Sequence, residues 1–376
     1  MITKIRLIGN RCINPRGFYK YQSYYIQGLK KIDAVNFSIV PIYSRLFASL
    51  TTNQIRGAPK LWHFCNSLAK NQCSIESNHV GRYIFDLGSD TVKVGIDVAD
   101  GKAIRDMQTY EWSDIYFKAN KWERRKYPEK VFPIINGNGA LNETKINQIK
   151  QFRNRKKEID LIFMTVIYAS TSRKRFYTNI EHHIRLFETL VKLDCSKVLK
   201  AIIPKQYSTQ MIGKYLKRLD RAGVPWSYTW DGMSSLDFWD HLAKARLVFL
   251  RPGKHACISW RMIDLLCMGA CVVYDSKPYP NWPIPLVSGK NYMECGCGLD
   301  MKESLPPHDR YNRIMRMIEQ LLKNKNKMET IRTNNRCYFD QHAAPKSIAN
   351  YILETVKTYR TDSRRATAFI PVSQAS

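Results

Sequence analysis

Short apolar runs alternate with helix-length segments along most of the 376-residue chain. Such alternation predicts parallel strands with helices packed on both faces of a sheet, so the expected fold class is α/β. Turn and loop residues separate the runs. The predicted strands are Lys4–Ile8, Phe37–Ile42, Arg82–Phe85, Val92–Ile96, Asp114–Phe117, Leu161–Tyr168, Val198–Ile203, Trp226–Tyr228, Leu247–Leu250 and Cys271–Tyr274.

The length of the chain predicts two domains, because single hydrophobic cores stop growing well below 376 residues. The strand pattern ends near Phe132–Gly139, a polar helical stretch follows, and the pattern then starts afresh. We therefore expect an N-terminal domain at residues 1–150 and a C-terminal domain at 151–344. A last helix at 345–360 is expected to pack back on the N-terminal domain, and residues 361–376 lack periodicity and are expected to be a mobile tail.

The charge balance is strongly basic, with 60 Lys and Arg against 32 Asp and Glu and a net charge of +28. Such an excess attracts nucleic acid, an anionic membrane surface or a phosphorylated small molecule. The charge is spread in short patches, which are commonly solvated faces. Because no helix-turn-helix, RNA-recognition or zinc signature accompanies it, no nucleic-acid partner is expected. A basic nucleic-acid-binding protein without enzymatic activity remains an alternative, and peripheral contact with an anionic membrane stays open.

The ten cysteines lie partly inside apolar runs, where they act as small hydrophobic side chains in the reduced state. Cys295-Gly-Cys297 has no second Cys or His pair at zinc-site spacing, so no metal site is expected. The N-terminus lacks the pattern of a secretory signal. No window reaches the ~20 apolar residues of a membrane-spanning helix. The expected location is therefore the cytoplasm.

Two buried strands, at Leu247–Leu250 and Cys271–Tyr274, are joined by a helix predicted at Ile258–Met268. The carboxyl ends of neighbouring parallel strands meet at one edge of a sheet, where open α/β sheets bind ligands. The loop Arg251–Cys257 lies at this edge and leads into the N-terminus of the helix. Because free N–H groups and the helix dipole favour phosphate there, the pattern predicts a nucleotide site.

Charged and polar side chains around this helix suit a nucleoside diphosphate. The cations can form charge-assisted bonds to the diphosphate, and a carboxylate one turn into the helix can accept bonds from both ribose hydroxyls. The alternative is that the arginines are surface residues and the carboxylate belongs to a salt bridge. The residues assigned to this donor site are Arg251, Lys254 and Arg261 for phosphate, Asp264 for ribose, and His255 and Ser259 beside them.

The segment Arg261–Val273 resembles the donor-site segment of GT-B glycosyltransferases, in which an acidic residue precedes a Gly and a Val-Val strand. It is similar in particular to the exostosin-like version, which has an Arg three residues before the acidic residue. Three further segments are similar to segments of bacterial and viral sugar transferases: Trp282–Tyr292, Asp114–Lys118 and Pro133–Asn138.

This resemblance implies two Rossmann-like domains with parallel sheets that face a central cleft. It also implies transfer of a sugar from a nucleotide-sugar co-substrate to a hydroxyl of a glycan, lipid or protein, with Asp264 on the ribose and without a metal ion. A sugar epimerase of the same fold is the alternative chemistry.

The resemblance also bears on the stereochemistry of transfer. Retaining members commonly carry a second Glu eight residues before the first, and Ala256 occupies that position. Inversion is therefore slightly favoured, and it needs a base from the N-terminal domain. Asp97, Asp100 and His79 are the candidates because each lies beside a predicted strand end, although a cap or turn role would also explain them.

A basic loop follows the first predicted strand of the second domain, at Ser170–Arg175. Fixed cations at this place can stabilise the negative charge that develops on a leaving nucleoside diphosphate. Arg173 and Arg175 are therefore assigned to the donor site as well. The alternative is a solvent-exposed basic turn.

Overall fold

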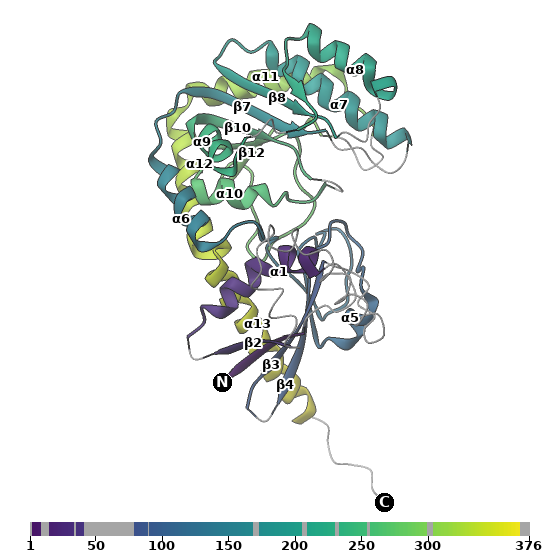
Figure 1. Ribbon diagram of the computed structural model, residues 1–376, viewed down its shortest axis with the longest axis vertical. Helices are drawn as coiled ribbons and strands as arrows, with labels where there is room; N and C mark the ends of the chain where they lie inside the picture. The colour runs from purple at the N-terminus through teal and green to yellow at the C-terminus, as the bar shows by residue number, and fades with distance from the viewer. Residues whose placement is uncertain are drawn as a thin grey trace, which may run out of the picture. The chain divides into compact units, whose positions relative to one another are not determined.

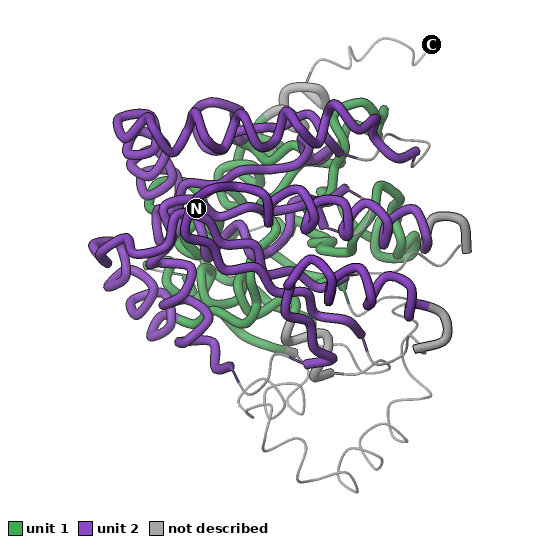
Figure 2. The backbone as a smooth tube through the Cα atoms, turned by 90° about the horizontal axis from the view of Figure 1, so that it is seen from above, with its two compact units in different colours: residues 1–142, 281–284, 340–376 green, residues 143–280, 285–339 purple. Residues whose placement is uncertain are grey.

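The structure is a computed structural model that describes residues 2–8, 15–33, 35–40, 79–88, 90–167, 173–204, 209–229, 233–253, 256–298 and 304–368. The chain forms two compact units, which Figure 2 shows in separate colours. Unit 1 comprises Met1–Asn142, Asn281–Ile284 and Asp340–Ser376, and unit 2 comprises Glu143–Pro280 and Pro285–Phe339. Each unit is an α/β structure built on a six-stranded sheet, in agreement with the predicted fold class.

The sheet of unit 1 is mixed, which corrects the expectation of a parallel sheet (Figure 1). β3 runs antiparallel to both of its neighbours, while the other pairs are parallel. In spatial order the strands are β2 (Asn36–Val40), β1 (Lys4–Ile8), β3 (Val80–Asp86), β4 (Thr91–Asp97), β5 (Ile115–Lys118) and β6 (Val131–Pro133).

The direction of β3 follows from its short connection to β4. Only residues 87–90 separate the two strands, and parallel neighbours need a crossover of a dozen or more residues. Gly88 has a φ of 89°, in the left-handed region that favours glycine, and it helps to close this turn. As a result, the residue before β3 lies beside the residues that follow β4.

Three described helices belong to unit 1: α1 (Pro15–Lys30), α5 (Met107–Trp112) and α13 (Pro345–Ala368). The C-terminal helix α13 packs against α1 so closely that a Cβ on Gly28 would lie 2.0 Å from the carbonyl oxygen of Pro345. The Tyr351 hydroxyl donates to the carbonyl of Pro133 at 2.9 Å, and its ring lies 5.8 Å from that of Phe117 on β5. The last helix therefore belongs to the core of the N-terminal unit.

The sheet of unit 2 is parallel throughout. In spatial order its strands are β12 (Tyr292–Glu294), β11 (Val272–Tyr274), β10 (Ala245–Leu250), β7 (Ile159–Val166), β8 (Lys197–Ile202) and β9 (Trp226–Ser227). The runs predicted in this half correspond to β7, β8, β9, β10 and β11. β12 and, in unit 1, β6 have only three residues each and were not predicted.

Helices cover both faces of this sheet (Figure 1). α7, α8 and α11 pack together on one face, and α6, α9, α10 and α12 lie on the other. Three aromatic rings, of Phe163, Phe187 and Phe249, meet at 4.7 and 5.1 Å in the core between sheet and α7. The helices are α6 (Glu143–Gln151), α7 (Arg173–Val191), α8 (Thr209–Arg221), α9 (Ser235–Lys244), α10 (Arg261–Met268), α11 (His308–Lys323) and α12 (Lys325–Tyr338), with the short turn Phe152–Asn154. The turn Phe339–Ala343 follows α12 and belongs to unit 1 from Asp340 onward.

The boundary between the units falls before α6, and not at residue 150. The helix α6 packs on α10, and the thiol of Cys267 donates to the carbonyl of Ile146 at 3.8 Å. A second departure is the segment 281–284, which leaves unit 2 and joins unit 1. There the Trp282 side chain is buried, and the backbone N–H of Asn281 donates to the carbonyl of Lys121 at 3.0 Å.

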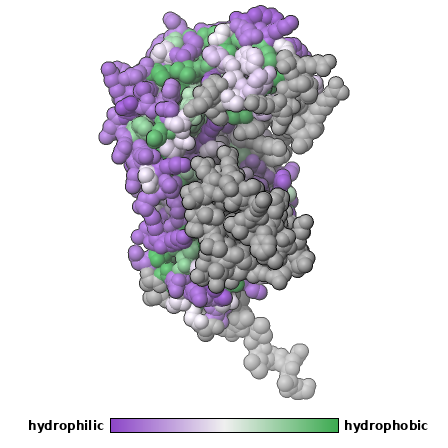
Figure 3. Space-filling model, viewed as in Figure 1, coloured by the Kyte–Doolittle hydropathy of each residue, from purple (hydrophilic) through white to green (hydrophobic). Residues whose placement is uncertain are grey.

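The visible outer face of unit 2 is largely hydrophilic, as Figure 3 shows. Most of its helices are amphipathic, with apolar side chains toward the sheet and charged side chains outward. Within the described ranges, no helix has both the length and the apolar character needed to cross a bilayer.

Candidate functional site

The strand order of unit 2 creates a topological switch point between β7 and β10. From β7 the chain proceeds through β8 to β9 on one side of the sheet, and it then returns to place β10 on the other side of β7. The connections that follow β7 and β10 therefore run in opposite directions over the sheet. Open α/β sheets bind ligands in the crevice that such a divergence leaves at the carboxyl ends of the strands.

The helix α10, which follows β10, begins at Arg261 and not at Ile258 as predicted. Ser259 lies two residues before this start and bonds to it. Its hydroxyl oxygen accepts the backbone N–H of Arg261 at 3.3 Å, and its carbonyl accepts the N–H of Met262 at 2.8 Å. Ser259 thus has a structural bond in addition to its predicted part in donor binding.

Arg261 and Asp264 both lie in the first turn of α10. Asp264 was expected one turn further into the helix, because the predicted helix began at Ile258. The Arg261 guanidinium donates to the carbonyl of Met164 on β7 at 3.3 Å and lies 5.2 Å from the ring of Phe238. Asp264 is 3% exposed, and its Oδ2 accepts a bond from the indole N–H of Trp239 at 3.1 Å. Trp239 was missed from the sequence because its apolar position in α9 gives no sign of this contact.

Arg251, at the end of β10, is held by acceptors of unit 2. Its Nε donates to Oδ2 of Asp275 at 2.8 Å, and its Nη1 donates to the side-chain oxygen of Asn179 at 2.9 Å. Its side chain is 11% exposed, and Asp275 is fully buried. Although burial alone would raise the pKa of Asp275, Arg251 and His182 hold that pKa below its ordinary value. Asp275 was not assigned to the site from the sequence, although a carboxylate directly after a buried strand is a recognisable signal.

Two neighbouring histidines of α7 complete this cluster. His182 lies between Oδ2 of Asp275, at 3.0 Å, and the hydroxyl of Tyr311, at 2.7 Å. Nη1 of Arg251 lies 2.7 Å from Nδ1 and 2.8 Å from Nε2 of His183. Burial, assisted by the charge of Arg251, lowers the pKa of His182 to about 4 and holds the pKa of His183 well below its ordinary value. Both rings are therefore neutral at pH 7.

The loop between β10 and α10 has an unusual backbone. Ala256 has a φ of 53°, which non-glycine residues seldom adopt and which often marks a functional loop. A Cβ on Gly253 would lie 2.7 Å from the sulfur of Cys257. Lys254 and His255, both assigned to donor binding, lie outside the described residues, as do the side chains of Arg173 and Arg175 at the start of α7.

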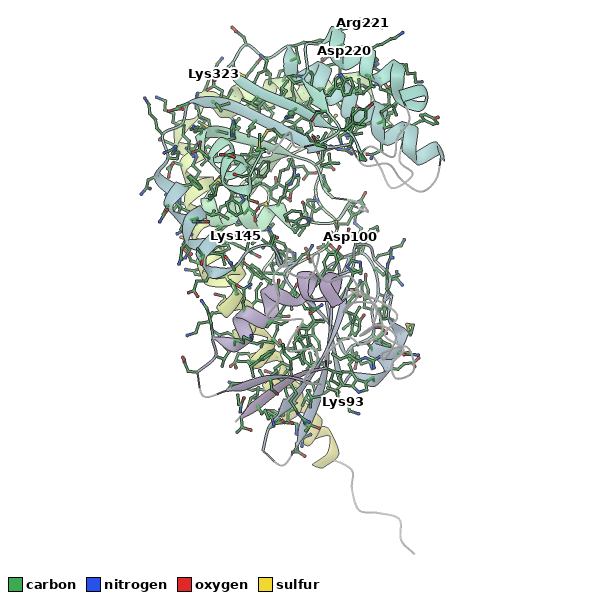
Figure 4. The ribbon with its side chains drawn as sticks, viewed as in Figure 1. Lys93, Asp100, Lys145, Asp220, Arg221 and Lys323 are labelled. Carbon is green, nitrogen blue, oxygen red and sulfur yellow. The ribbon has the colours of Figure 1, made fainter. Side chains whose placement is uncertain are left out.

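In unit 1 the structure brings the three candidate bases to one edge of the sheet. The antiparallel β3 places His79 beside the end of β4, where its carbonyl accepts the N–H of Val98 at 3.0 Å. Asp97 ends β4, and Asp100 lies three residues further on. In Figure 4, Asp100 and Lys93 lie at opposite ends of unit 1. Lys93 lies near the start of β4.

Asp97 is fully buried and accepts bonds from three donors. Lys118 Nζ and the Tyr116 hydroxyl each donate to Oδ2 at 3.0 Å, and the backbone N–H of Ala99 donates to Oδ1 at 2.8 Å. The side chains of Lys118 and Asp97 are both inaccessible to solvent. This arrangement stabilises the carboxylate as the partner of a buried cation, and it does not favour Asp97 as a base.

His79 is the candidate base with the most suitable surroundings. Its ring lies 4.1 Å from that of Tyr21 and is partly accessible to solvent. Burial lowers the pKa of His79, and the negative charges of Asp100 and Asp97 only partly oppose this effect. The imidazole is therefore neutral at pH 7 and can accept a proton.

The described residues contain no group of three His, Cys, Asp or Glu side chains arranged to hold a metal ion. Cys295 and Cys297 are buried free thiols. Burial raises the pKa of Cys297 to about 12 and raises that of Cys295 well above its ordinary value. Both thiols are therefore protonated at neutral pH.

No family model matches the sequence, and no curated protein matches it. HepE from Anabaena in complex with UDP is similar at 13% identity and a TM-score of 0.41, over 65% of this chain and 64% of HepE. The chain thus spans less than two thirds of HepE. A glycosyltransferase from Rickettsia africae is similar at 11% identity and a TM-score of 0.41, over 65% of this chain and 63% of that protein. TarM is similar at 11% identity and a TM-score of 0.46, over 94% of this chain and 98% of TarM.

Proposed function

We propose that this chain is a nucleotide-sugar-dependent glycosyltransferase of the GT-B type. Unit 2 binds the nucleotide sugar at the carboxyl edge of its sheet, between β7 and β10, and the sugar passes to a hydroxyl of a glycan, lipid or protein. The observation that carries the proposal is the topological switch point combined with Arg261 and Asp264 in the first turn of the helix that follows β10.

The side chains at this edge have the chemistry that a nucleoside diphosphate needs. Arg261 and Arg251 donate to the phosphates and offset the charge of the leaving group, so no metal ion takes part in the proposed reaction. Asp264 accepts from the ribose hydroxyls. A carboxylate has about four lone-pair sites, so the bond from Trp239 does not by itself exhaust its capacity.

Thermal unfolding tests the donor site. UDP, GDP, ADP, CDP, dTDP and their sugar conjugates are screened, and at least one is expected to raise the melting temperature. A ligand at one hundred times its dissociation constant stabilises the folded state by about 2.7 kcal/mol. Arg261→Ala and Asp264→Ala are expected to lose this rise, while the exposed Lys323→Ala, the matched control, keeps it. If none of the compounds shifts unfolding at millimolar concentration, the proposal is wrong.

We further propose that His79 takes the proton of the acceptor hydroxyl and that transfer inverts the anomeric centre. The motivating observation is the neutral, partly exposed imidazole beside Asp100. His79→Gln is expected to lower kcat by about 10²–10⁴-fold, the usual contribution of a general base, and to leave the donor-induced melting shift unchanged. A kcat equal to that of the wild type would remove His79 from the mechanism without affecting the donor site.

Asp97→Asn is the companion variant for the base assignment. It leaves the buried ammonium of Lys118 without its counter-ion, so it is expected to destabilise the protein by about 3–5 kcal/mol. A stable Asp97→Asn protein with no turnover would instead assign the base to Asp97.

A further inference from the structure

Tyr311, His182 and Asp275 form a hydrogen-bonded chain that the proposed donor site does not yet use. The chain begins on α11, passes through α7 and ends directly after β11, at the carboxyl edge of the sheet. His182 and Asp275 are fully buried and Tyr311 is 3% exposed, so solvent does not compete for their bonds. The chain ends on Oδ2 of Asp275, which also accepts from Nε of Arg251.

The partners assign a direction to every proton in this chain. An ionised carboxylate only accepts, so Nε2 of His182 must carry the proton that it donates to Asp275. In a neutral ring Nδ1 is then an acceptor, and it receives the hydroxyl proton of Tyr311. Tyr311 therefore selects the tautomer of His182, and that tautomer allows His182 to support Asp275.

His183 supports Arg251 from the opposite tautomer. Its Nδ1 lies 2.7 Å from the carbonyl of Asn179, which can only accept, so Nδ1 carries the proton. Nη1 of Arg251 lies 2.7 Å from this Nδ1 and 2.8 Å from Nε2. Because Nδ1 already carries a proton, Nε2 is the ring nitrogen that can accept from Nη1. With the bonds to Asp275 and to the side chain of Asn179, the named partners use three of the five N–H groups of the guanidinium.

We propose that Tyr311, His182 and Asp275 are positioning residues that orient Arg251 on the diphosphate of the bound nucleotide sugar. The inference rests on the proposed function and adds to it the residues that fix the phosphate-binding cation. Asp275 holds Nε, while Asn179 and His183 hold Nη1, so the plane of the guanidinium is set before the ligand arrives. The Nη2 edge meets the phosphate oxygens. A preorganised cation binds more tightly because less side-chain freedom is lost on binding.

The test compares ligands with and without phosphates. Calorimetry measures binding of inorganic pyrophosphate, of UDP, GDP, ADP, CDP and dTDP, and of the matching nucleosides. The variants are Tyr311→Phe, His182→Ala, His182→Gln and Asp275→Asn. Each variant is expected to weaken the binding of pyrophosphate and of the nucleoside diphosphate, and to leave the binding of the nucleoside unchanged. Where the bond to Asp275 is lost, the affinity should fall by about tenfold. If these residues had only a structural role, the variants would weaken the binding of the nucleoside by the same factor.

Conservative replacement provides a second readout. The amide N–H₂ of Gln can reach the place of Nε2–H, so His182→Gln is expected to recover most of the diphosphate affinity that His182→Ala loses. Arg246, at the other end of β10, pairs with Asp160 and is the matched control for Arg251. Arg251→Gln is expected to abolish pyrophosphate binding and Arg246→Gln to preserve it.

The outcomes separate this inference from the proposed function. If a nucleoside diphosphate binds but Tyr311→Phe and His182→Ala bind it as the wild type does, the inference is wrong and the function stands. If pyrophosphate binds through Arg251 and these variants weaken it, while no nucleoside diphosphate binds, the positioning role stands and the function is wrong. If the wild type binds neither, both are overturned.

Discussion

His182 links the stability of unit 2 to pH. Its pKa is lowered to about 4 in the folded protein by burial and by Arg251, whereas an unperturbed histidine has a pKa of about 6.5. Between these values the unfolded chain binds a proton that the folded chain does not, so stability is complete above about pH 6.5 and falls as pH is lowered toward 4. We expect this residue alone to reduce the free energy of unfolding by about 3 kcal/mol across that range.

Urea unfolding near pH 7.5 and pH 4.5 measures this effect. His182→Gln cannot take up the proton, so its stability should depend less on pH than that of the wild type. His241→Gln serves as the control, because His241 is hydrogen-bonded to its own helix at an exposed position. Equal pH dependence in the wild type and in His182→Gln would show that His182 is not held neutral.

Ala256 stores backbone strain in the loop before α10. A non-glycine residue in the left-handed region costs about 1–2 kcal/mol, and Ala256 has a φ of 53°. Ala256→Gly is therefore expected to raise the free energy of unfolding by about 0.5–1 kcal/mol, after the larger entropy loss of glycine is subtracted. Thermal unfolding checks this, with Ala270→Gly as the control that should destabilise, because Ala270 is buried and is not among the positive-φ residues of the described chain. A loss of stability in Ala256→Gly would contradict the assigned backbone.

At the scale of elements, part of the excess positive charge caps helices. The last carbonyls of a helix lack partners within the helix and carry partial negative charge, so cations stabilise them. Lysine and arginine side chains donate to such carbonyls at the ends of α5, α9, α10 and α11. The pairs are Lys130 with Tyr110, Lys157 with Ala243, Arg153 with Cys267 and Arg246 with Leu322.

Lys130 tests the value of these caps. Its Nζ donates to the carbonyls of Tyr110 and Ser113 at 2.7 and 2.8 Å, at the end of α5. A hydrogen bond to a charged group contributes about 1.5–3 kcal/mol, so Lys130→Met, which removes two, is expected to lower the free energy of unfolding by at least about 1.5–3 kcal/mol. The exposed Lys126, which lies in the loop before β6 and not at a helix end, provides the control, and Lys126→Met should stay within about 0.5 kcal/mol of the wild type. If the two variants are equally stable, the caps contribute nothing measurable.

Apolar periodicity predicted the elements better than their directions and contacts. The buried runs at β7, β10 and β11 are visible in the sequence because a parallel strand covered on both faces is apolar throughout. The direction of β3 depends on a four-residue turn, and Gly88-Ser89-Asp90 was the available signal. The contacts of Asp264 with Trp239 and of Asp275 with His182 join residues far apart in sequence, so no local pattern reveals them.

At the scale of the whole molecule, the two units differ in how the chain builds them. Unit 2 is a nearly continuous stretch from Glu143 to Phe339, interrupted only by residues 281–284. Unit 1 needs three separate segments. The buried Trp282 comes from the second segment, and α13 comes from the third. In the turn that precedes α13, the carbonyl of Ala343 accepts a hydrogen bond from the Tyr24 hydroxyl at 2.9 Å.

This difference predicts that the units behave differently as fragments. Residues 143–339 are expected to unfold cooperatively in urea on their own, because they contain the whole parallel sheet and its helices. Residues 1–142 are expected not to, because without α13 the apolar face of α1 and the rings of Tyr24 and Phe117 lose their cover. Joining residues 340–368 to 1–142 through a flexible linker should restore a cooperative transition. In the full chain, Trp282→Ala should lower the free energy of unfolding by about 3–5 kcal/mol, as for other buried aromatic residues. A cooperative transition of 1–142 alone, as stable as the linked fragment, would show that α13 does not belong to its core.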